Sequence, residues 1–239
     1  MSNLTKAGAD RHRFNSLQTH KAEKMKLFTA FFLLLLVASC QARTLIVDPG
    51  GSGDGKTLLA AISLAGNGDA IQILPGNYSG ATVDKSLNIY GRGAIVEGSL
   101  AVTAPGCIVS DITIKAGGKG AAVSLDSRDN QLVRCTVAGI ATAVIVTGEN
   151  NSIWECRIDS PQGVEIFGAK NRVLNSTISD TTSGTISGGT AVRINKTSEG
   201  MIAGCHISAL QGVLIEDSRG NAVINNTFSG NGFAVVLTR

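Results

Sequence analysis

The chain has 239 residues, of which 43% are hydrophobic and 16% charged, so it has enough apolar material for a buried core and is not a disordered tail. Aromatic residues make up only 4%, whereas glycine occurs 29 times, a composition that favours a strand-rich repetitive fold with frequent tight turns. The formal net charge is +3, but from Cys40 onward 15 Lys and Arg face 16 Asp and Glu, which gives no support for nucleic-acid binding.

The N-terminal segment has the pattern of an export signal. Lys24-Met25-Lys26 precedes an apolar stretch over 27–37 and then small residues, which describes a signal peptide over 25–42 better than a membrane span. Met25 has the position of a natural start. Residues 1–24 are therefore predicted to be a non-native N-terminal extension.

Two ways of processing this signal fit the sequence. Val37-Ala-Ser-Cys40 resembles a lipobox, in which Cys40 is lipidated, and ordinary cleavage after Ala42 is the alternative. In both cases we expect an extracytoplasmic protein, located in the cell envelope, in the periplasm or outside the cell. It would meet the membrane only through its signal peptide or a lipid anchor.

Residues 49–57, PGGSGDGKT, fit the phosphate-binding loop of nucleotide hydrolases, with Gly50, Gly55 and Lys56 at the required spacing. Such an enzyme also needs a parallel sheet with alternating helices and an aliphatic strand that ends in an aspartate for the metal. The strand-like segment 71–74 ends instead in Pro-Gly, and no segment after residue 66 has helical periodicity. The sequence therefore argues against a nucleotide site.

A repeat dominates the C-terminal half of the chain. Each copy starts with Asn or Gly, has an aliphatic residue two positions on, a small Cys, Ser or Asn five positions on and an apolar residue seven positions on. A second, Val-rich block follows each start. The first blocks lie at 130–137, 151–158, 171–178, 200–207 and 221–228, the second blocks at 144–146, 164–166, 192–194, 213–215 and 235–237, and a looser copy begins at Pro105.

The alternation of these blocks, their β-branched residues and their Gly and Asn turns indicate strands rather than helices. A coil of this length cannot bury its own apolar face, so neighbouring coils must stack. Parallel strands stacked about 4.8 Å apart make an all-β parallel β-helix, or β-solenoid, whose inward positions form columns of like residues. We predict one such domain over 44–239, with a polar loop over 179–189 projecting from it.

Both ends of a solenoid expose unpaired backbone groups and need cover. Residues 57–65 suit a short amphipathic capping helix over the N-terminal end, with the first coil starting at 70–73. No counterpart follows Leu237. We expect the uncapped C-terminal end to support self-association or another contact, and a shortened chain is the alternative.

Three N-terminal stretches, GSGDGKTLLAAISLAGNGDAIQILPGNYSG, DKSLNIYGRG and APGCIVSDITI, resemble the opening of right-handed parallel β-helix proteins of the pectin-lyase-like superfamily. The Asn-x-Ile repeats are most similar to the NosD-like periplasmic group. The resemblance implies a right-handed β-helix in which Gly50–Thr57 is the turn between an entry strand and the cap. It also implies either polysaccharide chemistry or an accessory role for a periplasmic metalloenzyme, because NosD-like proteins are associated with the copper site of nitrous oxide reductase.

The Asp, Arg and His signatures of pectinesterases, polygalacturonases, alginate epimerases and pectate lyases are absent, so no catalytic residue is predicted. The charges on the coil faces are expected to form ion pairs between adjacent coils, Arg134 with Glu155 and Glu165 with Arg193. The functional alternative is a sugar-binding strip of Arg134, Trp154, Glu155, Arg157 and Arg193, in which Trp154 is the only Trp of the chain.

Soft ligand types gather at Met201, Cys205 and His206. Successive strand residues point to opposite faces, so Cys205 is expected inside and His206 outside, and they cannot readily share one ion. We therefore predict no metal and no cofactor. The cysteines are better explained by packing, as free thiols in a column of small residues made of Ser110, Cys135, Cys156, Ser176, Cys205 and Asn226.

These patterns favour an exported binding or scaffolding module without a recognisable active site, with a polysaccharide as the expected partner. The alternatives are a truncated or divergent polysaccharide lyase, hydrolase or esterase, and a NosD-like accessory protein.

Overall fold

The computed structural model describes residues 42–180 and 189–239. The predicted extension over 1–24, the predicted signal peptide up to residue 41 and the possible lipidation site Cys40 lie outside the described residues, as does most of the predicted polar loop. Within the described ranges, no helix is long and apolar enough to cross a membrane.

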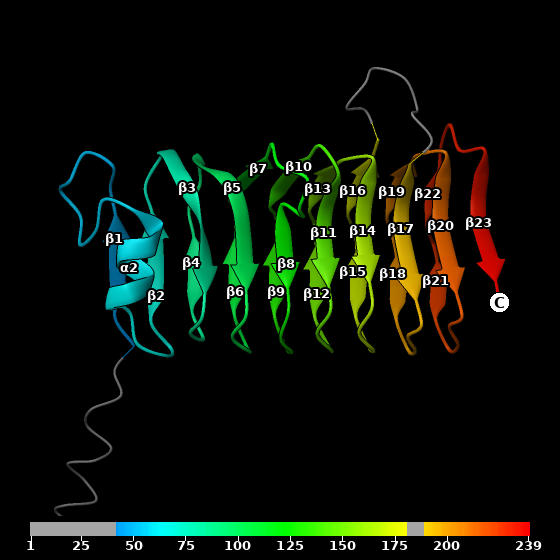
Figure 1. Cartoon of the computed structure of the whole chain (residues 1–239), viewed down its shortest axis with the longest axis horizontal. Coiled ribbons are helices and arrows are strands. Elements are labelled where there is room, and N and C mark those ends of the chain that lie inside the picture. The colour runs from blue at the N-terminus through cyan, green and yellow to red at the C-terminus, as the bar shows by residue number, and fades with distance from the viewer. Residues whose placement is uncertain (1–41, 181–188) are drawn as a thin grey trace, which may run out of the picture. The chain divides into compact units, whose positions relative to one another are not determined.

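Short parallel strands stack coil upon coil along the long axis, which confirms the predicted parallel β-helix (Figure 1). Residues Ala42–Arg239 make one unit. We call the first strand position of the coils the first row. It forms a nine-stranded parallel sheet of β1 (Thr44–Val47), β2 (Ala70–Ile73), β4 (Asn88–Tyr90), β6 (Ile108–Ser110), β9 (Gln131–Val133), β12 (Ser152–Trp154), β15 (Arg172–Leu174), β18 (Met201–Ala203) and β21 (Ala222–Ile224).

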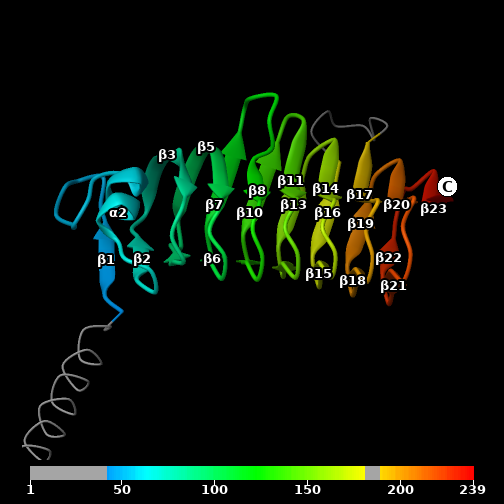
Figure 2. The same ribbon diagram turned by 60° about the horizontal axis from the view of Figure 1, so that its bottom comes forward.

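The other two strand positions form a second and a third row, which lie beside each other in Figure 2 and belong to one 14-stranded sheet. The second row contains β7 (Thr113–Ala116), β10 (Thr136–Gly139), β13 (Arg157–Asp159), β16 (Thr177–Ser179), β19 (His206–Ser208) and β22 (Thr227–Phe228). The third row contains β8 (Val123–Leu125), β11 (Thr142–Val146), β14 (Gln162–Ile166), β17 (Thr190–Asn195), β20 (Gln211–Glu216) and β23 (Phe233–Thr238).

The first coils join the second and third rows in one long bent strand. β3 (Gly76–Val83) pairs with β5 (Ala94–Val102), and β5 pairs with both β7 and β8. The bend uses glycine where no side chain fits, because a Cβ on Gly80 would lie 2.3 Å from the carbonyl oxygen of Ser99. β1 pairs with β2 in full register, so the stack begins at Thr44 rather than at the predicted 70–73.

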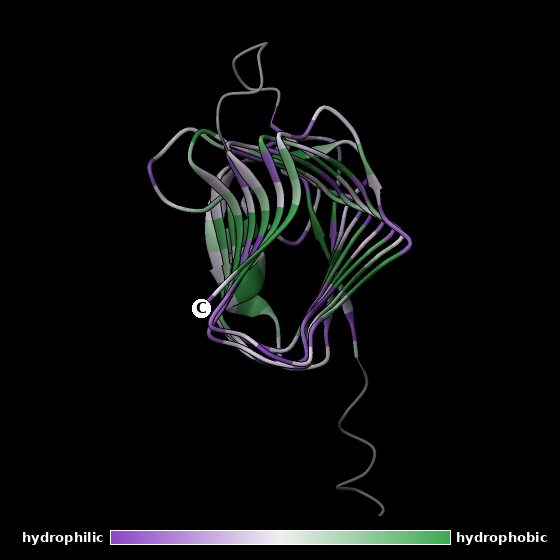
Figure 3. Ribbon diagram, turned by 90° about the vertical axis from the view of Figure 1, so that its right-hand side faces the viewer, coloured by the Kyte–Doolittle hydropathy of each residue, from purple (hydrophilic) through white to green (hydrophobic). Residues whose placement is uncertain are grey.

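Columns of like residues fill the interior, as the repeat predicts. Val144, Val164, Val192 and Val213 stand in register on adjacent coils and are each completely buried. Viewed along the stack, the coils superimpose on their straight sides (Figure 3). Complete burial of one such side chain contributes about 1.5–3 kcal/mol, and each depends on the coil above and below it.

A ladder of buried asparagines stands where each first block begins. The side-chain oxygen of Asn130 accepts from the backbone N–H of Cys107 (2.7 Å), that of Asn151 from Asn130 (2.8 Å), and that of Asn171 from Asn151 (2.7 Å). Each coil therefore satisfies a buried backbone donor of the coil before it. This explains why the repeats start with Asn.

The four cysteines in the described part of the chain, Cys107, Cys135, Cys156 and Cys205, are free and buried, as expected, but the predicted column contains one error. Hydrogen bonds place Ile112, and not Ser110, in the position equivalent to Cys135, because Ser110 stands in register with Val133. A hydrogen bond with Cys135 together with burial raises the pKa of the Cys156 thiol well above its usual range. Burial also raises the pKa of the Cys107 and Cys205 thiols, so Cys107, Cys156 and Cys205 are packing groups of low reactivity.

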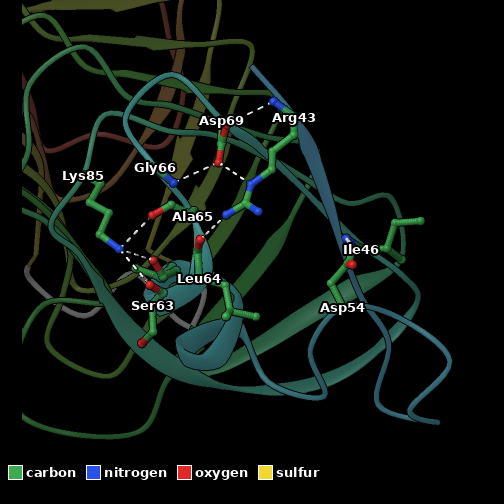
Figure 4. A network of polar contacts seen from close by, with 10 residues as sticks. Arg43, Ile46, Asp54, Ser63, Leu64, Ala65, Gly66, Asp69 and Lys85 are labelled. Carbon is green, nitrogen blue, oxygen red and sulfur yellow. Dashed lines mark hydrogen bonds and ion pairs between the residues drawn. The ribbon is translucent and has the colours of Figure 1, made fainter. Parts of the chain in front are cut away.

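The predicted cap is the helix α2 (Leu58–Leu64). Its N-cap Thr57 accepts from the backbone N–H of Ala60 (3.1 Å), and Leu58, Ala61 and Ile62 are buried against the first coils. At the other end the Lys85 ammonium donates to three backbone carbonyls, those of Ile62 (2.8 Å), Ser63 (3.0 Å) and Ala65 (2.8 Å). A cation thus satisfies the carbonyls that the helix end leaves free (Figure 4).

Asp69 ties the entry to β1 to the end of this helix. Its carboxylate accepts from the backbone N–H of Arg43 (3.0 Å) and of Gly66 (2.8 Å) and from Nε of the Arg43 guanidinium (3.0 Å), as Figure 4 shows. These hydrogen bonds lower the pKa of Asp69 to about 2 from 3.8.

Replacing Asn151 by Ala removes the acceptor of the buried Asn130 N–H. We expect the free energy of unfolding to fall by about 1–3 kcal/mol, because a buried donor is left unpaired. Urea titration followed by circular dichroism measures the change. Ser152→Ala, at the neighbouring outward position, is the control, and an equal loss in both variants would contradict the role of the ladder.

Asp69→Asn should destabilise the protein in a pH-dependent way. A carboxylate with a lowered pKa in the folded state contributes stability above pH 3.8, and that contribution is lost as the pH falls toward about 2. The Tm difference between wild type and Asp69→Asn should therefore be largest near neutral pH and shrink toward pH 2. A difference that is constant over this range would refute the assignment.

Candidate functional site

The outward face of the first row carries two aromatic side chains in one line. Tyr90, Ser110, Val133 and Trp154 follow one another in register on four adjacent coils. Trp154 is 41% exposed and Tyr90 is half-buried, whereas Ser110 and Val133 between them are small and nearly covered. Three strand spacings separate the two rings by about 14 Å. We call this line the aromatic row.

A ladder of left-handed residues borders the aromatic row at the corner before the second row. Asp111, Arg134, Glu155 and Asn175 have φ between +49° and +58°, and Gly204 and Asn225 continue the same positions. A single left-handed residue turns the chain sharply there, at a steric cost for every side chain except glycine. The corner therefore presents polar and charged groups beside the rings.

The ion pairs at this corner and on the third row differ from those predicted. Arg134 makes a bidentate pair with Asp111 on the preceding coil (2.9 and 2.8 Å) rather than with Glu155. Arg193 pairs with Glu216 on the following coil rather than with Glu165. Asp111 is in the column of Arg134, on the other neighbouring coil, whereas Glu216 is in register with Asn195, so Arg193 pairs diagonally with a residue of another column.

The predicted sugar-binding strip is only partly assembled. Arg134, Trp154, Glu155 and Arg157 lie within four consecutive positions of adjacent coils, around the corner between β12 and β13. Arg193 is on β17 in the third row and belongs to a different face. The predicted strip did not include Tyr90. The polar-apolar-polar alternation of 88–90 predicts an outward Tyr90, but the irregular first coils hide its register with Trp154.

A hollow of about 620 Å³ opens on the turns between the third and the first row. It spans the coils from β11 to β23, and its lining includes Glu149, Phe167, Lys196, Asp217 and Arg219. Phe167 is 41% exposed there. We call this hollow the turn groove.

The glycine loop before the cap is closed to a phosphate. The Asp48 carboxylate accepts from the backbone N–H of Gly50 (2.8 Å) and of Ser52 (3.1 Å) and from the Ser52 hydroxyl. These hydrogen bonds lower the pKa of Asp48. This aspartate satisfies two of the N–H groups that a phosphate-binding loop would offer to its ligand, and backbone carbonyls of Asp48 and Ile46 satisfy those of Gly51, Asp54 and Gly55, which argues against the nucleotide interpretation.

Comparison with known proteins identifies the family. A family model described as periplasmic copper-binding protein (NosD) matches residues 74–239. The chain belongs to the NosD family. The family's description agrees with the extracytoplasmic location predicted from the sequence. No curated protein matches the chain in sequence.

Several solved structures share the fold of this NosD protein. Dettilon tailspike protein has a TM-score of 0.64 and 15% identity over 74% of this chain and 41% of the tailspike. A mannuronic acid specific polysaccharide family 6 lyase from human gut microbiota has a TM-score of 0.52 and 14% identity over 79% of this chain and 59% of the lyase. Escherichia coli YbhC has a TM-score of 0.57 and 10% identity over 80% of this chain and 86% of YbhC.

These similarities confirm the resemblance to pectin-lyase-like right-handed β-helix proteins. The chain spans less than two thirds of the tailspike and of the lyase. At identities this low the neighbours share only the fold, and fold alone does not transfer an activity.

The corner ladder makes a prediction about stability. Glu155 has φ +55°, a conformation that asparagine adopts far more readily than glutamate. Glu155→Asn should therefore raise the free energy of unfolding by about 0.5–1 kcal/mol in urea titrations. Glu165→Asn, in the extended β14, is the control and should give no gain; equal effects in both variants would contradict the strain argument.

Proposed function

We propose that this NosD protein is an extracytoplasmic binding or scaffolding module that holds a carbohydrate chain on the outward face of the first row. The observation that carries the proposal is the aromatic row, which sets Tyr90 and Trp154 in register about 14 Å apart on a regular surface. Aromatic rings offer flat apolar platforms, and the edges of Tyr and Trp can also donate hydrogen bonds. Sugar rings present matching apolar faces and hydroxyl groups.

The corner ladder adds polar partners to this surface. The Arg134 guanidinium is held by Asp111, which fixes its position. Glu155 lies exposed at the corner next to Trp154, and Arg157 lies exposed just beyond the corner, at the start of β13. An extended chain lying along the stack would meet one polar or charged corner residue per coil and two aromatic rings three coils apart. A regular ligand suits a regular surface, which favours a polysaccharide over a small molecule.

The family description raises copper as a second candidate ligand, and the described residues do not fit it. In residues 42–180 and 189–239 no group of three His, Cys, Asp or Glu side chains is placed to hold a metal ion. Cys205 is buried, whereas the adjacent His206 points outward and contacts the Ser229 hydroxyl (3.2 Å). We therefore derive no step through copper, and an accessory role would have to use contacts other than a metal site in this region.

Attachment and association complete the proposal. Lipidation of Cys40 would fix the module to the envelope, and cleavage after Ala42 would release it. Self-association would use the C-terminal coil, where Phe233, Val235 and Leu237 are 59%, 44% and 73% exposed. Apolar side chains exposed together in this way favour contact with another surface.

A panel of acidic and neutral glycans tests the function. Wild-type protein should bind at least one polymer, and Trp154→Ala and Tyr90→Ala should each weaken binding about fivefold to tenfold through loss of stacking. Ile140→Ala, at an exposed apolar residue in the turn between β10 and β11, is the control and should leave this binding unchanged. Isothermal titration calorimetry with soluble fragments measures the affinities.

The same glycan panel tests the rival function, that of a polysaccharide lyase. Ultraviolet absorbance of unsaturated sugar ends would reveal a lyase, and that result would replace the binding module by an enzyme. Binding that survives the Trp154→Ala, Tyr90→Ala double variant unchanged would remove the aromatic row from the site.

A further inference from the structure

The turn groove arises from a step in turn length. Ile166 and Ile194 are in register, and so are Lys170 and Glu199, because the N–H of Lys170 donates to the carbonyl of Ser198 (2.9 Å). The later turn therefore contains one residue more than the earlier one and projects farther from the stack. The following coil keeps the longer turn, so the groove has a short-turn side and a long-turn side.

Its floor is rigid and has no room for side chains. A Cβ on Gly168 would lie 1.9 Å from the carbonyl oxygen of Gly148. The Gly168 carbonyl accepts from the Asn171 amide (2.7 Å) and from the buried Thr197 hydroxyl (2.6 Å), so the asparagine ladder supports the floor. A preformed floor keeps the loss of conformational entropy on binding small.

The walls combine three kinds of group. Phe167 supplies an exposed ring, and Lys196 and Arg219 supply cations that have no ion-pair partner within the described part of the chain. Lys170 nearby is different, because Glu199 holds it at 3.8 Å. The carboxylates of Glu149 and Asp217 also line the groove and are exposed.

We propose that the turn groove binds a short stretch of a uronic-acid-containing oligosaccharide, with Phe167 under a sugar ring, Lys196 and Arg219 at its carboxylates, and Glu149 and Asp217 accepting from its hydroxyls. The choice of carbohydrate rests on the proposed function, whereas the site is separate from the aromatic row. A volume of about 620 Å³ is in the range of ordinary ligand pockets.

The mixture of charges selects this chemistry over others. A neutral sugar leaves Lys196, Arg219 and the neighbouring Arg239 without an anionic partner, and a phosphate dianion brings no hydroxyl donors for Glu149 and Asp217. A ligand with many hydroxyl donors and one negative charge per ring satisfies both kinds of group. Charge-assisted hydrogen bonds from Arg to carboxylate are among the stronger polar contacts available to a protein.

Calorimetry with the full-length protein tests the site, using trigalacturonate and the same trimer with its carboxylates reduced to alcohols. We expect trigalacturonate to bind at least tenfold more tightly than the reduced trimer, and more weakly at high salt. Arg219→Gln, Lys196→Gln and Phe167→Ala should each raise its Kd about tenfold. Lys170→Gln, which removes a cation outside the groove lining, and Trp154→Ala should leave the Kd within twofold.

The outcomes separate this inference from the proposed function. The inference fails if the reduced trimer binds as tightly as trigalacturonate, or if Lys170→Gln weakens binding as much as Arg219→Gln. Either result means that the groove does not recognise the carboxylates. If Trp154→Ala alone abolishes trigalacturonate binding, the ligand is on the aromatic row, so the inference fails and the proposed function stands. Unchanged thermal unfolding of each variant shows that the fold is intact.

Discussion

The structure depends on equivalent residues of successive coils standing directly over one another. A single coil offers only a few inward side chains, such as Val164 and Ile166 in β14, and cannot bury them alone. In the stack Val164 lies between Val144 and Val192, Ile166 lies between Val146 and Ile194, and the backbone of β14 is paired on both sides. The sequence must therefore encode the register between strands of adjacent coils. It does so by repeating the same type of side chain at equivalent positions.

Most inward polar groups serve this stacking, although the side-chain amide N–H groups of Asn130, Asn151 and Asn221 have no hydrogen-bond partner among the described residues. The asparagine ladder serves backbone donors, and Cys135, Cys156 and Cys205 each lie within 3.5 Å of carbonyl oxygens while filling small spaces. A thiol in such a column is a poor ligand and a poor nucleophile because its ionised form would be buried without compensation. Recognition therefore falls to the outward rows and the turns.

The regular coils could be predicted from sequence and the irregular ones could not. Spacing alone predicted the valine columns and the cap over 57–65. It misplaced Ser110 because β3 and β5 run through two rows and the first copy lacks the leading Asn, where Cys107 stands instead. The repeat position of Arg134 also could not decide between a partner on the preceding coil, Asp111, and one on the following coil, Glu155. Arg193 was assigned to the wrong face because the order of blocks does not say which side of the coil each one occupies.

The turn groove shows how such a fold changes its surface without losing its register. An extra residue within a strand would turn every later side chain to the opposite face. An extra residue in a turn costs little loop-closure entropy and leaves the columns intact. The signal was present in the sequence, since five positions separate Ile166 from Asn171 and six separate Ile194 from Gly200. Surface chemistry on this scaffold can thus vary through turn length while the register of the interior is kept. This is consistent with the 10–15% sequence identity between this chain and solved structures that share its architecture.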